Sequence, residues 1–295
     1  MICRDCRHTL NTSGPGRWIA QAPGNNRIRG YHLSQLYSPW ANLRAMIEAS
    51  EETTPAAIQE FQNSDLGEAF VPPGGGLSVD VIDRCRDGYG LDEYAGQECT
   101  MGVDVGIRLH VVVRERCSKK GQRGSCGQPH RLWFAGEATW DDLLALVKRF
   151  NVQQCLIDAQ PEMHMASQFV RGNPGVASLA QYGRHENGHH YQRGDGSRPN
   201  VYHINRPEAM DEVMQRFHDR LVLLPRDARG LGGRVRDGLG DYYRQILAPK
   251  RTLEQDAQGN WVSRWVDNGK ADHYAHAELY CMMAERIDTD TWTMV

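Results

Sequence analysis

The alternation of short apolar segments with helical segments after residue 98 constrains the fold of this chain more than any other feature. The apolar segments are rich in β-branched residues and bounded by Gly, Pro or polar clusters, which is typical of buried strands. They are residues 99–115, 131–138, 153–160 and 175–183. Helices are predicted between and after them, at residues 139–150, 161–172, 205–221 and 272–287.

Strands that alternate with helices predict an α/β domain with a mixed sheet. Residues 99–115 are long enough for a long strand or a hairpin, so antiparallel strands come first and parallel crossovers follow. This order predicts a ribonuclease-H-like mixed sheet flanked by helices. Residues 251–266 predict a separate hairpin around a polar turn.

Three regions are predicted along the chain. Residues 1–29 are rich in Gly, Pro, Asn and Arg and are expected to be irregular. Residues 30–95 are expected to form a mostly helical extension, with short helices on either side of a linker at residues 71–76. Residues 96–295 are expected to hold the ribonuclease-H-like domain.

Cys3 and Cys6 are the one pair among the eight cysteines with close C-x-x-C spacing. A structural zinc site needs four ligands, and only His8 stands nearby as a third. The pair is therefore either the remnant of a zinc ribbon or two free surface thiols, and the sequence leaves both interpretations open. The Zn²⁺ ion is uncertain for the same reason.

Positive charge is concentrated in two strips, although the net charge is −3. Residues 114–131 carry six Lys or Arg against one acid, and residues 223–251 carry seven against three. Such strips either bind phosphate or form solvated faces. Lys119, Lys120 and Arg123 lie at a predicted hairpin tip and are the candidates for contact with a DNA backbone.

Other classes of protein are disfavoured by what the sequence lacks. No apolar run approaches the roughly 20 residues that span a membrane. The scattered cysteines predict a reduced, cytosolic protein. No phosphate loop of the form G-x-x-x-x-G-K-[ST] occurs, so no ATPase motor is expected in this chain.

Asp104 lies inside the apolar stretch TMGVDVGIRLHVVV, residues 100–113. An ionised carboxylate in a buried strand is costly unless it is paired or holds a cation. Gly102 and Gly106 flank it, and we expect them to leave room for a ligand close to the backbone.

Asp158 and Asp272 are expected to join Asp104, because one ends the strand CLID and the other opens the last helix. Strand ends and adjoining helix termini converge at one edge of an α/β sheet. Oxygen ligands alone favour Mg²⁺ or Mn²⁺, and two such ions can activate water and stabilise a phosphodiester undergoing displacement. Each aspartate also has a structural alternative: an Arg partner for Asp104, and helix capping for the other two.

Five segments together resemble the C-terminal nuclease region of the large terminase subunit of tailed double-stranded-DNA phages, the lambda-like packaging family. They are GYHLSQLYSPW, FQNSDLGEAF, MGVDVG, CLIDAQPE and NGKADHYAHAELYCMMA, and they occur in the family's order. The resemblance implies a ribonuclease-H-like, metal-dependent endonuclease that cuts concatemeric viral DNA. It places the family's acidic triad on Asp104, Asp158 and Asp272.

The resemblance also implies partners and a location. Double-stranded DNA, the terminase motor domain, the small terminase subunit and the portal are the expected partners, and the host cytoplasm is the expected location. The family has an upstream motor domain with a phosphate loop and a full zinc ribbon, and neither occurs here. We therefore expect a nuclease fragment or a split-gene product without ATPase activity.

Further residues have weaker signals. Asp211 is either a further acid of the site or a solvated helix residue, and His273 and His276 either contact phosphate or pack structurally. The histidines of residues 185–190 are expected in a flexible insertion. The competing functions are a resolvase-like or transposase-like nuclease, and a non-catalytic assembly module that docks on a packaging motor or portal.

Overall fold

The computed structural model describes residues 17–18, 31–38, 40–51, 60–67, 75–117, 127–183, 188–195, 198–255, 261–267 and 269–287. The chain forms two compact units, Met1–Pro73 and Gly74–Val295, and each is described by itself. Cys3, Cys6, Lys119, Lys120 and Arg123 lie outside the described residues.

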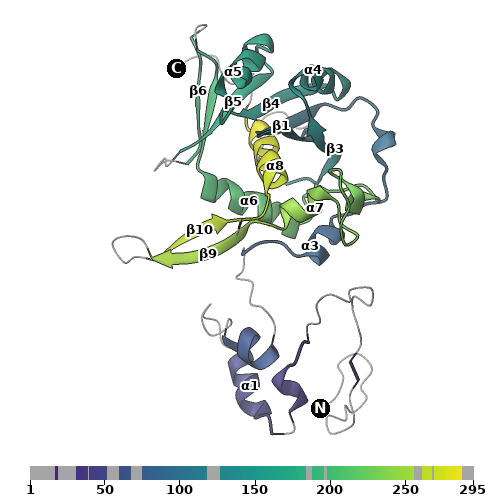
Figure 1. Ribbon diagram of the computed structural model, residues 1–295, viewed down its shortest axis with the longest axis vertical. Coiled ribbons are helices and arrows are strands. Elements are labelled where there is room, and N and C mark those ends of the chain that lie inside the picture. The colour runs from purple at the N-terminus through teal and green to yellow at the C-terminus, as the bar shows by residue number, and fades with distance from the viewer. Residues whose placement is uncertain are drawn as a thin grey trace. The chain divides into compact units, whose positions relative to one another are not determined.

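The first unit contains short helical elements, which are labelled from α1 in Figure 1. They are η1 (Gln35–Tyr37), α1 (Leu43–Ser50) and η2 (Phe61–Leu66). Asn42 caps α1 by accepting a hydrogen bond of 3.1 Å from the backbone N–H of Ala45. Ser34 donates a hydrogen bond of 3.0 Å to the carbonyl of Asp65, which ties the start of η1 to η2.

The second unit is built on a mixed sheet with eight strands among the described residues. They are β1 (Cys99–Val105), β2 (Leu109–Glu115), β3 (His130–Ala138), β4 (Val152–Asp158), β5 (Ala177–Tyr182), β6 (His190–Gln192), β7 (Val201–Ile204) and β8 (Val222–Leu223). The order is β6-β7-β5-β4-β1-β2-β3-β8. The first three strands are antiparallel, and β4, β5 and β7 continue parallel to β1. The predicted mixed sheet of the ribonuclease-H type is confirmed.

Helices cover both faces of this sheet (Figure 1). They are α3 (Val79–Arg84), α4 (Trp140–Arg149), α5 (Met163–Gly172), α6 (Arg206–His218), α7 (Asp241–Ile246) and α8 (His273–Ala284), with short turns η3 (Leu91–Glu93) and η4 (Ala228–Gly230). Side chains alternate between the faces, so Val111 packs with the α4 and α5 side and Val112 with the α6, α7 and α8 side. The predicted hairpin forms β9 (Lys250–Gln255) and β10 (Trp261–Val266).

The observed boundary between the units lies between Pro73 and Gly74, within the predicted linker. Residues 78–95 belong to the second unit, whereas the sequence places them in the helical extension. Val81 and Ile82 of α3 are buried in the same core as Phe217 of α6, and Cys85 Sγ lies 3.2 Å from the Phe217 carbonyl oxygen. These apolar contacts bind α3 to the sheet domain.

Helix α8 lies against β1, β2 and β4 and is buried from Tyr274 to Ala284 (Figure 1). Gly102 makes this contact close, because a Cβ atom there would lie 2.0 Å from the Ala277 carbonyl oxygen and 2.2 Å from the Cys281 nitrogen. The expectation that Gly102 leaves room for a ligand is therefore wrong, since the space is filled by helix backbone. At Gly106 the nearest atom would be 3.5 Å away.

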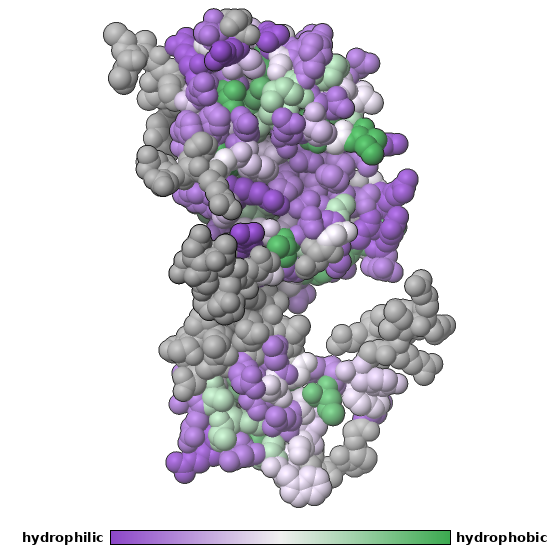
Figure 2. All heavy atoms as spheres, turned by 60° about the vertical axis from the view of Figure 1, so that its left-hand side comes forward, coloured by the Kyte–Doolittle hydropathy of each residue, from purple (hydrophilic) through white to green (hydrophobic). Residues whose placement is uncertain are grey.

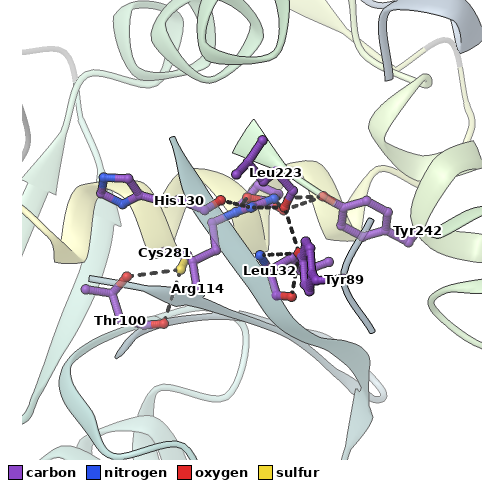
Figure 3. Close-up of polar contacts among 9 residues, drawn as sticks. Tyr89, Thr100, Arg114, His130, Leu132, Leu223, Tyr242 and Cys281 are labelled. Atoms are coloured by element: carbon purple, nitrogen blue, oxygen red, sulfur yellow. Dashed lines mark hydrogen bonds and ion pairs between the residues drawn. The ribbon is translucent and has the colours of Figure 1, made fainter. Parts of the chain in front are cut away.

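A buried ion pair fixes α8 to β2 (Figure 3). Arg114 donates hydrogen bonds of 2.7 and 2.5 Å to the two carboxylate oxygens of Glu278, and Tyr242 donates one of 2.5 Å to the same carboxylate. Both Arg114 and Arg116 are buried. The interpretation of residues 114–131 as a continuous exposed basic strip is therefore wrong at these two positions, because they face the interior.

On the face shown in Figure 2, hydrophilic side chains cover most of the coloured surface and hydrophobic ones are scattered. Among the described residues, no helix combines the length and the apolar character that crossing a bilayer requires.

Candidate active site

Asp104 and Asp158 end adjacent parallel strands. Val103 of β1 is paired with Ile157 of β4, so the next residues in register are the two aspartates. Neighbouring strands lie about 4.8 Å apart, which brings these carboxylates together on the face covered by α8. Asp104 is 6% exposed.

Asp272 comes from α8, where it is the residue immediately before the first turn. Its side chain makes no capping hydrogen bond to the helix backbone. Instead it accepts a hydrogen bond of 3.1 Å from His276 Nε2, and its carboxylate lies 3.9 Å from the Arg206 guanidinium. Helix capping by this side chain, the structural alternative for Asp272, is therefore wrong.

His273 follows Asp272 and reaches β1, where its Nδ1 lies 2.9 Å from Asp104 Oδ2. A carboxylate accepts hydrogen bonds, so His273 Nδ1 is the donor, and this bond raises the pKa of His273. The His273 ring stacks on His110 with ring centroids 4.4 Å apart. His110 is paired with Asp104 across the hairpin, and burial lowers its pKa.

The electrostatic environments of the acids differ. Burial raises the pKa of Asp158, and the negative charge of Asp104 raises it further. Burial also disfavours the charged form of Asp272, but the hydrogen bond from His276 and the charge of Arg206 outweigh it and lower the pKa. Asp158 and Asp104 are therefore a repelling pair that a cation would stabilise.

A polar layer supports the acids from behind. Tyr280 donates a hydrogen bond of 2.7 Å to Asp158 Oδ2, and the backbone N–H of Gln160 donates one of 2.9 Å to Asp158 Oδ1. A hydrogen bond of 2.6 Å joins Tyr182 Oη to His276 Nδ1. The Tyr182 and Tyr280 rings stack with centroids 5.6 Å apart, which connects the surroundings of Asp158 and His276.

The donor set fits a divalent cation of the Mg²⁺ or Mn²⁺ type. Buried carboxylate oxygens with mutual repulsion are the ligands that such ions prefer. Asp104 also belongs to a second group, because potential ligand atoms of Asp104, His110 and His273 all lie within 4.8 Å of one another. Asp104 is thus the residue shared by the carboxylate set and the mixed imidazole–carboxylate set.

Sequence reasoning missed His110, Tyr182, Arg206 and Tyr280. The signal for His110 was available in principle, since a hairpin turn centred on Ile107 places it opposite Asp104. Tyr182 and Arg206 come from β5 and the start of α6, and no local pattern connects them to the acids.

Two candidates from the sequence lie elsewhere. Asp211 accepts a hydrogen bond of 2.8 Å from Trp265 Nε1 and lies 3.0 Å from Arg251, so it ties α6 to the β9–β10 hairpin. The segment around His190 forms β6 on β7, where a flexible insertion was expected. His189 there lies near Glu208 and Glu212, and Arg286 also binds Glu212.

No protein-family model and no curated protein matches this sequence. Solved structures do match. The large terminase nuclease from thermophilic phage G20c is 13% identical with a TM-score of 0.37, and the match covers 67% of this chain and 85% of that chain. The human cytomegalovirus terminase nuclease domain is 9% identical with a TM-score of 0.36, covering 70% and 92%.

The full large terminase of another thermophilic bacteriophage is 9% identical with a TM-score of 0.44. The match covers 87% of this chain and 55% of that chain, so this chain spans about half the length of that protein. The chain is thus similar to terminase nuclease domains, the class of protein whose nuclease region its sequence resembles. The chemistry of its site is argued from its own residues.

Proposed function

We propose that this chain is a metal-dependent endonuclease that cuts double-stranded DNA, as the nuclease of a viral DNA-packaging terminase. The observation that carries the proposal is the arrangement of Asp104 and Asp158 at the ends of adjacent parallel strands, with Asp272 at the start of the helix that covers both. The sequence resemblance assigns the same three residues to the acidic triad of the lambda-like packaging family.

Asp104, Asp158 and Asp272 would hold two divalent cations, Mg²⁺ or Mn²⁺, with Asp104 shared between them. Bound there, the ions would lower the pKa of an attacking water and stabilise negative charge on the phosphodiester. The raised pKa of Asp158 supports this assignment, because the unrelieved repulsion from Asp104 contributes to it.

The other residues of the site orient the acids. Tyr280 and the backbone of Gln160 hold the two oxygens of Asp158, and His276 holds Asp272. His273 is bonded to Asp104, and its side chain is 42% exposed, so its free edge can meet a phosphate oxygen. Arg206 adds a positive charge beside Asp272.

The test is cleavage of supercoiled plasmid by the full chain with Mg²⁺, with Mn²⁺ or with a chelator. We expect nicking with either metal, none with the chelator, and a loss of about 100-fold or more in Asp104→Asn, because a catalytic electrostatic contact is worth that much. Asp219→Asn is the matched control, since Asp219 is an exposed aspartate after α6.

Cleavage that survives in Asp104→Asn would contradict the assignment of the acids. A folded chain that binds DNA but cuts it with no metal would favour the alternative, a nuclease-like module that docks on a packaging motor or portal. The terminase motor domain, the small terminase subunit and the portal enter the proposal as partners through the resemblance, and co-purification with each would test them.

A further inference from the structure

A cavity of about 730 Å³ lies beside the candidate active site. Its lining includes five cationic side chains, from Arg108, Arg234, Arg236, Arg244 and Lys270. Its volume lies in the range of pockets that hold nucleotide-sized ligands. The cavity is a separate feature from the acids, since none of Asp104, Asp158 and Asp272 lines it.

The cavity is positioned by the same elements as the acids. Lys270 and Ala271, both in its lining, directly precede Asp272. Arg108 lies on the turn between β1 and β2, four residues after Asp104. A polymer that places one group at the acids can therefore continue into this cavity.

Charge in the cavity is unbalanced. Glu137 and Asp241 are the acids in its lining. Arg108 lies 2.8 Å from Glu137, and Arg244 forms an ion pair with Asp241. The lining thus carries three cationic side chains in excess, and this excess favours an anionic ligand.

The remaining cations, Arg234, Arg236 and Lys270, are exposed. Their side chains form no ion pair or hydrogen bond among the described residues. Within the predicted basic strip of residues 223–251 this separates two arginines from the rest, because Arg226 binds Glu93 and Arg229 binds Asp83. The uncommitted charge of the strip therefore lies at this cavity.

The loop that carries the two arginines is held in shape. Arg236 and Leu239 exchange two backbone hydrogen bonds of 2.9 Å. The residues between them, Asp237 and Gly238, both have positive φ, at 52° and 77°. This is the geometry of a tight two-residue hairpin turn. Figure 1 shows the loop before α7 winding beside that helix.

Packing fixes the other end of the loop. A Cβ atom at Gly232 would lie 2.4 Å from the Tyr242 nitrogen, and Gly232 has a φ of 85°. The backbone N–H of Arg234 donates a hydrogen bond of 3.1 Å to Asp241. Cations on a shaped loop lose less freedom on binding than cations on a flexible tail, which favours contact at fixed positions.

We propose that this cavity binds the sugar–phosphate backbone of the DNA strand next to the cleavage position, with Arg234, Arg236 and Lys270 contacting its phosphates. The inference rests on the proposed function and adds the surface that holds the substrate. Contacts to phosphate carry no base information, so the surface binds DNA without regard to sequence.

The test measures binding separately from cleavage. The full chain carrying Asp104→Asn is titrated with a fluorescein-labelled DNA duplex, in chelator, at several salt concentrations. A combined Arg234→Gln, Arg236→Gln and Lys270→Gln variant should weaken binding and reduce the slope of log K against log salt by about 2 to 3, since each phosphate contact contributes about 0.9. The control is Arg226→Gln with Arg229→Gln, which removes paired arginines of the same strip.

An unchanged slope in the triple variant, or an equal change in the control, would overturn the proposal. The three side chains are exposed, so the thermal unfolding midpoint should stay within about 2 °C of the parent, which shows that binding and not folding has changed. Failure of the proposed function is distinguished by plasmid cleavage. Absent cleavage with a reduced slope would retain the DNA surface, whereas metal-dependent cleavage with an unchanged slope would reject it alone.

Discussion

At the scale of single residues, buried charges in this protein are paired. Arg114 is held by Glu278, and Glu285 is held by three donors: His130, Arg216 and the backbone of Cys117. Removing one partner of such a group leaves the other buried and uncompensated, which is more costly than the pair is stabilising. The interior thus tolerates charge only where several elements meet.

Glu285 provides a prediction for the pH dependence of stability. Burial raises its pKa, but the hydrogen bond from His130 and the charge of Arg216 outweigh burial and set the pKa below the ordinary value of 4.5. The unfolded chain therefore binds the proton at higher pH than the folded chain does. The stabilisation is present above the unfolded pKa and is lost as pH falls through the folded pKa.

We expect Glu285→Gln to reduce the free energy of unfolding by about 1–3 kcal/mol near neutral pH. The gap to the parent should narrow below pH ~4.5, where the parent carboxylate takes up its proton. Urea unfolding at several pH values measures this. Glu93→Gln, which removes an exposed partner of Arg226, is the control and should cost about 1 kcal/mol or less. A gap that widens in acid would contradict the account.

At the scale of elements, the position of α8 decides whether a site exists. The helix carries Asp272, His273 and His276, while the strands carry Asp104 and Asp158. The strands and helices were predicted correctly from apolar spacing and from their start and stop signals, because those patterns are local. The close approach of α8 to β1 was not predicted, because it depends on residues far apart in sequence.

Gly102→Ala tests this packing. The added methyl would overlap the backbone of α8, so we expect a loss of about 1–3 kcal/mol in the free energy of unfolding. Plasmid nicking should fall as well, because α8 would shift and carry Asp272 away from Asp104. Gly106→Ala is the matched control, since the nearest atom there is 3.5 Å away. Equal stability and nicking in the two variants would show that the approach at Gly102 is not needed.

At the scale of the whole molecule, the two large buried apolar clusters draw all their residues from the second unit. Both clusters begin after residue 76 and include both faces of the sheet. A unit with its own apolar core is expected to fold by itself.

We therefore expect a chain of residues 74–295 to unfold in one cooperative transition. Its urea midpoint should match that of the corresponding transition in the full chain, and its metal-dependent nicking should be within about threefold of the full chain, since less than 1 kcal/mol separates such rates. Circular dichroism and the plasmid assay measure these two quantities. A shortened chain that is molten or inactive would show that residues 1–73 complete the domain.

The sequence by itself determined the order and type of the main elements, because period and capping signals are local properties of the chain. It also identified Asp104, since a carboxylate among valines has a free-energy cost that needs a partner. Only the tertiary structure decided which groups surround that carboxylate. His110 faces Asp104 through strand register, Tyr280 holds Asp158 through helix packing, and the free cations of the basic strip were separated from the paired ones. These contacts join residues far apart in the chain, and such partners are fixed by packing.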